Sequence, residues 1–408
     1  MNLKFHQTYW LSIITLFEKL IPLILLPVLL NDLGLGDYGI LYLILTIVNF
    51  FLPVFSFGFN LFFSKEYSKK NENIFTKIFS NFLLIQFFFF LIIILIIFLL
   101  MFLNLLSINF FDLIILLLLP SSRVLNLAVK EIFIIKQQIK QSAILVLFIF
   151  IIDLTITLVS LKIFDFGYKS RIYGTSLALF LTSFFSLLYL RKYIYLKINR
   201  YYLFKWFLFG KKIIQYRIFG FILNQGNRFV IQFFLGEIYL GIYMVSLQIA
   251  SPFLIIMKAF SSGWNSFIYN FLKTRPLKIN FLLKVNILFF LFLTGVLICH
   301  QYITYNYFTL FIKSVDLNTV LIFQLLICIA YIFQNLYNIF FPILIYKGNQ
   351  GFISKISLYL SSLNLFLNVF LVYYFESIIV ACILFLINWM IMYSLTLIKT
   401  YKLIKSNS

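Results

Sequence analysis

Long apolar runs separated by short polar stretches make up almost the whole chain. From Phe87 to Leu103 the sequence carries seventeen consecutive apolar residues, and a helix of about 20 such residues crosses the ~30 Å hydrocarbon core of a membrane. The alternation of apolar and polar residues that marks a transmembrane barrel strand is missing from the sequence. The pattern therefore predicts an all-α integral membrane protein.

The polar breaks between these runs divide the chain into twelve predicted transmembrane helices. They cover residues 9–31, 38–63, 78–104, 109–134, 142–163, 173–195, 213–235, 238–262, 281–300, 317–345, 354–375 and 378–399. The composition supports this prediction, because 63% of the residues are hydrophobic and 11% are charged, whereas about a quarter of a soluble domain is charged.

The basic residues predict the orientation. With a cytoplasmic N-terminus, 25 of the 33 Lys and Arg residues fall in cytoplasmic segments, and the opposite side receives four: Lys162, Lys169, Arg171 and Lys313. Cytoplasmic segments of membrane proteins are enriched in Lys and Arg, so both termini are predicted to be cytoplasmic. The net charge of +21 then reflects topology and favours contact with anionic membrane lipids. No nucleic-acid partner is expected, because the sequence contains no concentrated basic patch with its own fold.

Two short glycine-containing stretches resemble each other. "LGLGDYGI" at 33–40 and "LGEIYLGI" at 235–242 share Leu, Gly, Gly and Ile at a constant offset of 202 residues. "GFN" at 58–60 and "GWN" at 263–265 match more weakly, at an offset of 205. These offsets are close to half the chain and predict two six-helix lobes, 1–200 and 201–408, around a central cavity. Because each repeat has an even number of spans, the lobes would run parallel.

Six charged residues lie inside the predicted spans. A charged side chain near the membrane centre costs roughly 2.5–3.5 kcal/mol on insertion scales, so it usually pairs internally or lines an aqueous pathway. Four of the six are cations and two are acids: Lys19, Arg123, Arg228, Lys258, Glu18 and Asp153. The interior thus keeps a formal charge of +2, and we expect it to hold an anionic ligand. Arg228 is the strongest candidate, because a guanidinium binds phosphate oxygens in a bidentate manner.

Polar residues also form stripes on several predicted spans. Asn60, Asn224 and Asn265 lie on the polar faces of spans two, seven and eight, and with the four cations they are the candidate substrate-binding residues. The alternative is that such stripes hold helices together through interhelical hydrogen bonds. Glu18 and Asp153 are candidates for ion coupling, and the favoured alternative is that both are structural counter-ions.

Motifs for catalysis and for metal binding are missing from the sequence. It contains no G-x-x-x-x-G-K-[ST] phosphate loop, and His6 and His300, the two histidines, form no triad or metal-ligand spacing. The three cysteines are single residues within apolar runs. A transporter is therefore favoured over an enzyme, and we expect no metal and no cofactor.

Three stretches resemble a known family. They are "PLILLPVLLNDLGLGDYGILYL" at 22–43, "FGFN" at 57–60 and "NRFVIQFFLGEIYLGIYMVSLQI" at 227–249. Together with twelve spans in about 400 residues, they resemble the Wzx-type polysaccharide repeat-unit flippases of O-antigen and capsule synthesis, in the multidrug/oligosaccharidyl-lipid/polysaccharide exporter superfamily. The resemblance runs the whole length. Asn227 departs from it, because many relatives have an acid before the arginine.

This resemblance implies two lobes in a V, with spans one, two, seven and eight lining a cationic cavity. It implies that the chain moves undecaprenyl-diphosphate-linked oligosaccharides from the inner to the outer leaflet of the bacterial cytoplasmic membrane by alternating access. Asn, Gln and Tyr side chains would hydrogen-bond the sugar, and the polyprenyl tail would stay in the lipid. A polysaccharide polymerase and glycosyltransferases are the protein partners it suggests.

Three other functions compete with this interpretation. A multidrug exporter of the same superfamily would normally carry cations, which suit an electropositive interior poorly. A peptidoglycan lipid flippase typically has fourteen spans. A membrane-embedded polysaccharide polymerase or glycosyltransferase would need acidic catalytic residues on a large external loop, and the longest predicted outer loop, 301–316, offers only Asp316.

Overall fold

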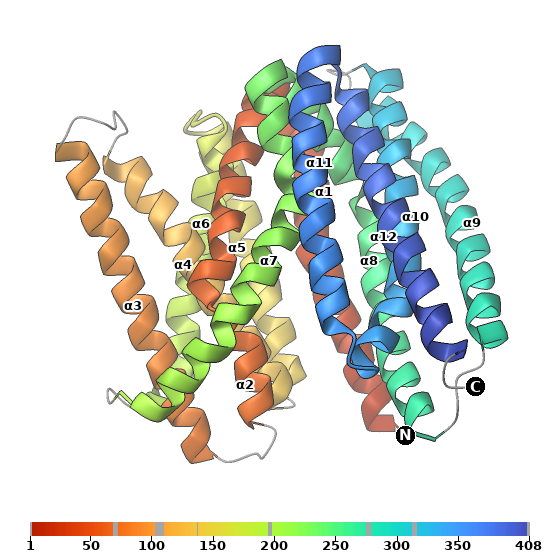
Figure 1. Ribbon diagram of the computed structural model, residues 1–408. Coiled ribbons are helices and arrows are strands. Elements are labelled where there is room, and N and C mark those ends of the chain that lie inside the picture. The colour runs from red at the N-terminus through yellow and green to blue at the C-terminus, as the bar shows by residue number, and fades with distance from the viewer. Residues whose placement is uncertain are drawn as a thin grey trace. The chain divides into compact units, whose positions relative to one another are not determined.

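The computed structural model describes residues 2–67, 72–102, 110–136, 138–194, 198–274, 279–311 and 316–405, and these are helical almost throughout (Figure 1). The helices are α1 (Asn2–Ser56), α2 (Phe59–Tyr67), α3 (Glu72–Phe102), α4 (Phe110–Ile135), α5 (Ile139–Lys162), α6 (Lys169–Tyr189), α7 (Arg200–Leu235), α8 (Glu237–Thr274), α9 (Ile279–Phe311), α10 (Leu317–Tyr346), α11 (Gln350–Phe375) and α12 (Ile378–Lys405). A short 3-10 helix, η1, covers Arg191–Tyr193.

The predicted fold class is confirmed. Helix α1 contributes two membrane-crossing arms that meet at a kink at Gly34, and α3 to α12 contribute ten helices, which makes twelve in the described part of the chain. Nine helical segments of the described residues are long and apolar enough, by length and composition, to cross a membrane. The chain is therefore an all-α, multi-pass membrane protein.

The helices group into two compact units. The first contains residues 1–21 and 44–218, and the second contains residues 22–43 and 219–408. Relative to the predicted lobes, the segment 201–218 goes with the first unit and the segment 22–43 with the second. The lobe boundary at residue 200 stays a prediction.

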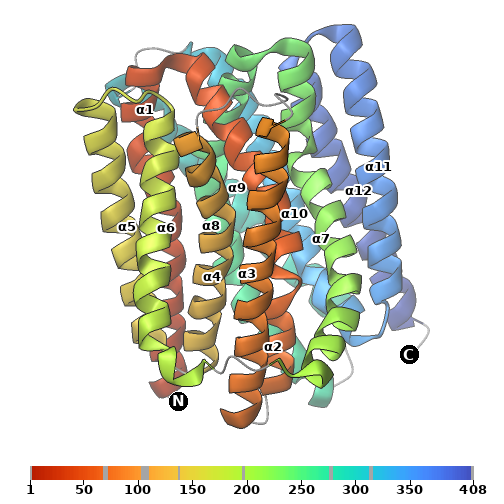
Figure 2. The same ribbon diagram turned by 90° about the vertical axis from the view of Figure 1, so that its left-hand side faces the viewer.

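In the first unit, α6 packs against both α4 and α5, and α5 and α6 lie side by side in both views (Figure 2). The core at one end of this unit is rich in aromatic residues. Phe59 stacks on Phe82 with 3.9 Å between the ring centroids, and the buried indole of Trp206 donates a hydrogen bond of 2.8 Å to the Phe57 carbonyl. Burial of several such rings is the main stabilising contribution to this core.

The "FGFN" motif forms the break between α1 and α2. Phe57 and Gly58 both have positive φ, 43° and 67°, which ends α1 and turns the chain into α2. A side chain at Gly210 on α7 would collide with the Phe57 ring. This glycine therefore allows the N-terminal part of α7, which was predicted to be a loop up to residue 212, to pack as a helix on the aromatic core.

In the second unit, α10 packs against both α8 and α12, and Figure 1 shows these three helices next to one another. The unit also contains both glycine stretches. Gly34 and Gly236 have φ of 72° and 93°, a left-handed backbone that glycine adopts without steric cost. They lie at the same offset of 202 residues as the sequence match, and each separates two successive helical arms. Gly58 and Gly263 do not correspond in this way, because Gly263 lies inside the continuous helix α8.

The two glycine stretches contact each other. A Cβ atom at Gly39 would lie under 3.0 Å from the Glu237 carbonyl oxygen, and one at Gly241 would lie under 3.0 Å from the Leu35 carbonyl oxygen. Residues 39 and 241, and likewise 35 and 237, are both 202 apart, so the contact is reciprocal. Such a self-complementary contact is the kind found between two copies related by a two-fold axis. The repeated glycine motif thus marks the point at which the two backbones cross closely.

Candidate functional site

Arg228 lies on α7 among polar groups of the second unit. Its Nη1 atom donates a hydrogen bond of 3.0 Å to Gln225 Oε1, one turn earlier on the same helix. Tyr42, Tyr243 and Tyr331, from α1, α8 and α10, lie near enough to interact electrostatically with the guanidinium. Three helices besides α7 therefore each contribute a phenol to the electrostatic surroundings of Arg228. We call Arg228, Gln225 and the three tyrosines the Arg228 cluster.

The neighbouring asparagines on α7 have different surroundings. Asn227 is buried, and its Nδ2 donates a hydrogen bond of 3.1 Å to the Ala381 carbonyl on α12. Asn224 is half-buried and donates to the Gly220 carbonyl one turn back, at 2.7 Å. Asn227, the residue that departs from the family pattern, thus joins two helices. Asn224 directly precedes Gln225 of the Arg228 cluster along α7.

The cluster suits an anionic, hydroxylated ligand. A guanidinium presents donors in a planar fork that matches phosphate oxygens, and the surrounding amide and phenol groups both donate and accept hydrogen bonds. The sequence identified Arg228 and Asn224, which lie on the polar face of span seven. It did not identify the three tyrosines, because nothing distinguishes them among the 26 tyrosines of the chain.

Asp153 forms a buried ion pair with Arg171 in the first unit. The carboxylate on α5 accepts a hydrogen bond from Arg171 Nη1 on α6, and Thr157 Oγ1 donates to the same carboxylate oxygen at 3.3 Å. Gly174 on α6 faces Thr157 with no room for a Cβ atom, so the two helices approach closely here. The Arg171 side chain is buried, and its position toward the outer side of the membrane stays a prediction.

The pairing bears on the predicted charge count. Asp153 and Arg171 neutralise each other, and the predicted excess of +2 within the spans stays a prediction. Asp153 is the structural counter-ion of Arg171, and a role in ion coupling stays a prediction. Lys19, Lys258 and Glu18 cannot be added to this picture, because their side chains lie outside the described part of the structure.

The remaining predicted residues divide between the two units. Arg123 and Asn60 are half-buried in the first unit, and Asn265 is half-buried in the second. Beside Arg123, Asn126 is used for packing: its Nδ2 donates to the Leu179 carbonyl at 2.7 Å and to Ser183 Oγ at 2.6 Å, which joins α4 to α6. The α4 stripe thus serves in part as interhelical hydrogen bonding. Convergence of the cations on one cavity stays a prediction.

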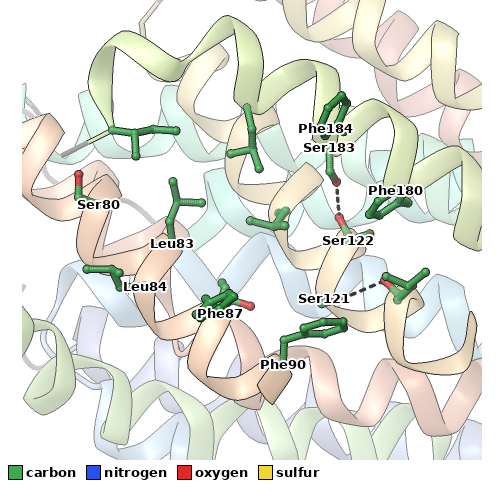
Figure 3. A pocket seen from close by; sticks show the side chains of 15 residues that line it. Ser80, Leu83, Leu84, Phe87, Phe90, Ser121, Ser122, Phe180, Ser183 and Phe184 are labelled. Carbon is green, nitrogen blue, oxygen red and sulfur yellow. Dashed lines mark hydrogen bonds between the residues drawn. The ribbon is translucent and has the colours of Figure 1, made fainter. Parts of the chain in front are cut away.

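A cavity of about 520 Å³ lies within the first unit, between α3, α4 and α6 (Figure 3). Its lining is almost entirely apolar, with Leu83, Phe87 and Phe184 among the residues around it. Two of its serines direct their hydroxyls at backbone carbonyls: Ser121 donates to Leu118 at 3.1 Å and Ser183 donates to Ser122 at 3.2 Å. The lining contains none of the predicted substrate-binding residues, and this chemistry does not suit a diphosphate.

Solved structures of membrane transporters share the fold. An inward-facing multidrug resistance MATE family transporter of the MOP superfamily is 13% identical, with a TM-score of 0.67 and 95% of each chain covered. A MATE in complex with MaL6 is 12% identical, with a TM-score of 0.68, and the match covers 98% of this chain and 95% of that one. A MOP superfamily transporter from Pyrococcus furiosus is 12% identical, with a TM-score of 0.63 over 98% of this chain and 94% of that one. The chain therefore shares the fold of these MATE transporters.

The family is shown by the sequence. The chain belongs to the polysaccharide biosynthesis protein family, which matches residues 5–263. None of the curated proteins matches the chain. The family description connects the chain with polysaccharide synthesis, and its fold is the one seen in the solved transporters.

Proposed function

We propose that this protein is a flippase that moves undecaprenyl-diphosphate-linked oligosaccharide repeat units from the inner to the outer leaflet of the bacterial cytoplasmic membrane. The observation that carries the proposal is the Arg228 cluster: a guanidinium hydrogen-bonded to an amide, with three phenols contributing to its electrostatics, inside a membrane-spanning unit of a polysaccharide biosynthesis family member. Both termini would be cytoplasmic.

The chemistry of the cluster matches the polar part of such a substrate. The diphosphate carries the negative charge that Arg228 attracts, and a charge–charge contact is strong in a low-dielectric interior. Gln225 fixes the direction of the guanidinium through the 3.0 Å hydrogen bond, while Asn224 and the tyrosine hydroxyls offer hydrogen bonds to sugar. The polyprenyl tail needs no polar contact and would stay in the lipid.

Alternating access would supply the movement. The lipid-linked sugar enters from the inner leaflet, the cationic site holds the diphosphate while the access side changes, and the substrate leaves into the outer leaflet. Glycosyltransferases would supply the substrate and a polysaccharide polymerase would consume it, so both are expected partners.

A multidrug exporter is the second candidate, and the similarity to a multidrug resistance MATE transporter favours it. Arg228 argues against this function for cationic drugs, since like charges repel. The MOP superfamily transporter from Pyrococcus furiosus is described as having a binding pocket of reverse polarity that suggests a different function. By analogy, a change of pocket charge within this fold fits a change of cargo.

A charge-reversal experiment tests the proposal. Arg228→Glu should abolish surface polysaccharide and cause lipid-linked repeat units to accumulate at the inner leaflet, with unchanged amounts of protein in the membrane. Lys347→Glu, which reverses an exposed charge, is the matched control and should behave as wild type. Normal polysaccharide in the Arg228→Glu strain, or drug sensitivity without any loss of polysaccharide, would exclude the flippase function.

A further inference from the structure

His300 joins three helices of the second unit through its two ring nitrogens. The residue lies on α9, and its Nε2 is 3.1 Å from the Ile249 carbonyl oxygen on α8. Its Nδ1 is 2.9 Å from Gln324 Nε2 on α10. Because a carbonyl can only accept, Nε2 carries the hydrogen, and Nδ1 of the neutral ring accepts a hydrogen from the Gln324 amide. The neutral imidazole is thus satisfied at both nitrogens.

The Ile249 carbonyl belongs to a weakened turn of α8. Pro252 lies inside this helix, and a proline both lacks the N–H of the helical hydrogen bond and forces the preceding turn open. The His300 N–H reaches the carbonyl three residues before this proline from a neighbouring helix. The Phe253 ring stands edge-on to the imidazole, 5.8 Å between centroids. Pro252 leaves the carbonyl of Gln248 without its helical N–H partner, and one side chain of α9 bonds the next carbonyl of the same turn.

The Gln324 amide can reorient when His300 takes up a proton. Its side chain is fully buried, and its Oε1 atom finds no hydrogen-bond partner among the residues that the structure describes. A proton on Nδ1 would face the amide NH₂ group, donor against donor. A half-turn of the amide would replace that donor with the oxygen, which would then accept from Nδ1–H. The half-turn requires no backbone movement.

The other groups around the ring do not ionise near neutral pH. On α8 they are the Ile249 carbonyl and the Phe253 ring. On α10 the Cys328 sulfur lies 3.4 Å from Gln324 Nε2. On α9 itself the Thr304 hydroxyl donates to the His300 carbonyl at 2.7 Å and lies 3.5 Å from His300 Nδ1. No Asp, Glu, Lys or Arg side chain among the described residues contributes to the electrostatics of the ring. His300 would therefore respond to pH by itself.

We propose that His300 is a proton-binding site that tightens the turn of α8 at Pro252. Imidazole is the side chain with an ordinary pKa near 6.5, between pH 5 and 8. Proton uptake turns the Nε2–H bond to the Ile249 carbonyl into a charge-assisted bond, which is about twice as strong. His300 is half-buried and lies six residues before the end of the α9 apolar segment at Asn306, about 9 Å along the helix. The proton would enter from that end.

The proton uptake is measured by ¹⁵N NMR on histidine-labelled protein in nanodiscs. With His6→Gln and a purification tag without histidine, His300 gives the single pair of ring signals. We expect these to change from the neutral Nε2–H pattern to imidazolium between pH 8 and 5. In Gln324→Glu the carboxylate would accept from Nδ1–H, and the midpoint should rise by about one pH unit or more. Ring signals that stay neutral down to pH 5 would overturn the proposal.

The effect on α8 is measured by hydrogen exchange of a peptide covering 249–257, corrected for the intrinsic pH dependence. Protection in the wild type should rise about fivefold from pH 7.5 to pH 5.5, as expected for one strengthened hydrogen bond. His300→Gln keeps a donor but cannot titrate, so its protection should not change with pH. Equal pH dependence in the wild type and in His300→Gln, or none in a wild type that titrates, would overturn the link to α8. If His300→Gln does not fold, Gln324→Glu provides the same test through its shifted midpoint.

Discussion

Gly39 and Gly241 lie 202 residues apart, and each faces the backbone carbonyl of the residue four positions before the other. Gly39 faces the carbonyl of Glu237 and Gly241 faces that of Leu35, with room for no Cβ atom at either position. The contact is self-complementary. It joins the second arm of α1 to the beginning of α8 and fixes how closely the two backbones approach.

We expect alanine at either glycine to destabilise this crossing. A methyl group would occupy the position of a carbonyl oxygen, so the helices must separate, and overpacking of this kind typically costs about 1–3 kcal/mol. Because both substitutions separate the same pair of helices, their combined effect should be smaller than the sum. Thermal unfolding of the purified protein in detergent, followed by size-exclusion chromatography, measures both effects.

Gly295 provides the control. It lies inside α9 with nothing within 4 Å of the position of a Cβ atom. Gly295→Ala should therefore raise stability by about 0.5–1 kcal/mol through helix propensity. Equal thermal stability of Gly39→Ala, Gly241→Ala and Gly295→Ala would show that the glycines are not needed for the crossing.

The number of helices and the glycine repeat were predictable, because apolar run length and a constant offset can both be read directly from the sequence. The long N-terminal extension of α7 was not predicted. The sequence from Arg200 to Lys211 is rich in basic residues and was interpreted as a loop, but its Trp206 and Gly210 pack on the aromatic core. Only the tertiary contact shows that this basic segment is half-buried.

The α7 residues of the Arg228 cluster were predictable from the sequence, and its tyrosines on other helices were not. Helical periodicity brings Gln225 and Arg228 to one face, but tyrosines on three other helices are placed there by packing. The burial of Arg171 was not predictable for a related reason. This residue comes two residues after the start of α6, where a basic residue normally marks the membrane boundary. Its burial depends on Asp153, 18 residues earlier on another helix.

Loss of one partner of the Asp153–Arg171 pair should be severely destabilising. Asp153→Asn leaves the Arg171 guanidinium buried beside a neutral amide, and breaking a buried pair in this way costs about 3–5 kcal/mol. The double substitution Asp153→Leu with Arg171→Met removes both charges and should recover most of the loss. Thermal stability and the amount of protein in the membrane provide the comparison.

Transport by the same double variant separates structure from ion coupling. If Asp153 only neutralises Arg171, the stably folded double variant should transport at a rate close to wild type. A stable double variant without transport would instead assign Asp153 a role in ion coupling.

The Lys205–Glu66 pair should make a contribution to the free energy of unfolding that depends on pH in the alkaline range. The hydrogen bond of 2.8 Å from Lys205 Nζ to the Glu66 carboxylate raises the pKa of Lys205 above its ordinary value of 10.5. A raised pKa means that the stabilisation is fully present below pH 10.5 and is lost as the pH rises through the folded-state value. Since the Lys205 side chain is 42% exposed, solvent screening limits the effect to less than about 1 kcal/mol.

Unfolding of Glu66→Gln across the alkaline range measures this contribution. The variant should be slightly less stable than wild type at pH 8, and the difference should shrink above pH 10.5 and in high salt. Lys211→Met, on the exposed side of the same helix, should change stability by no more than about 0.5 kcal/mol. A stability difference for Glu66→Gln that is constant with pH would contradict the assignment.

The predicted topology is tested by reporter fusions on either side of the second span. A phosphatase fused after Asp37 should be active, because this position is predicted to be extracytoplasmic. A fluorescent protein fused after Lys70 should fold, because the predicted loop is cytoplasmic. The reverse pattern would place both termini outside and would invert the direction of transport proposed here.

The proposed anion site is tested most sharply by Gln225→Glu. The new carboxylate would stand where the amide oxygen now accepts the Arg228 hydrogen bond at 3.0 Å, so shape is kept and a neutral partner becomes a negative one. A charge-assisted hydrogen bond is stronger than a neutral one, and stability should therefore be equal or higher. Diphosphate binding and flipping should nevertheless fall at least tenfold, because the guanidinium charge is neutralised. Gln225→Met, which removes the hydrogen bond and adds no charge, should reduce transport much less. Similar losses in both variants would show that Arg228 needs its amide partner for position, and that its charge does not bind the substrate.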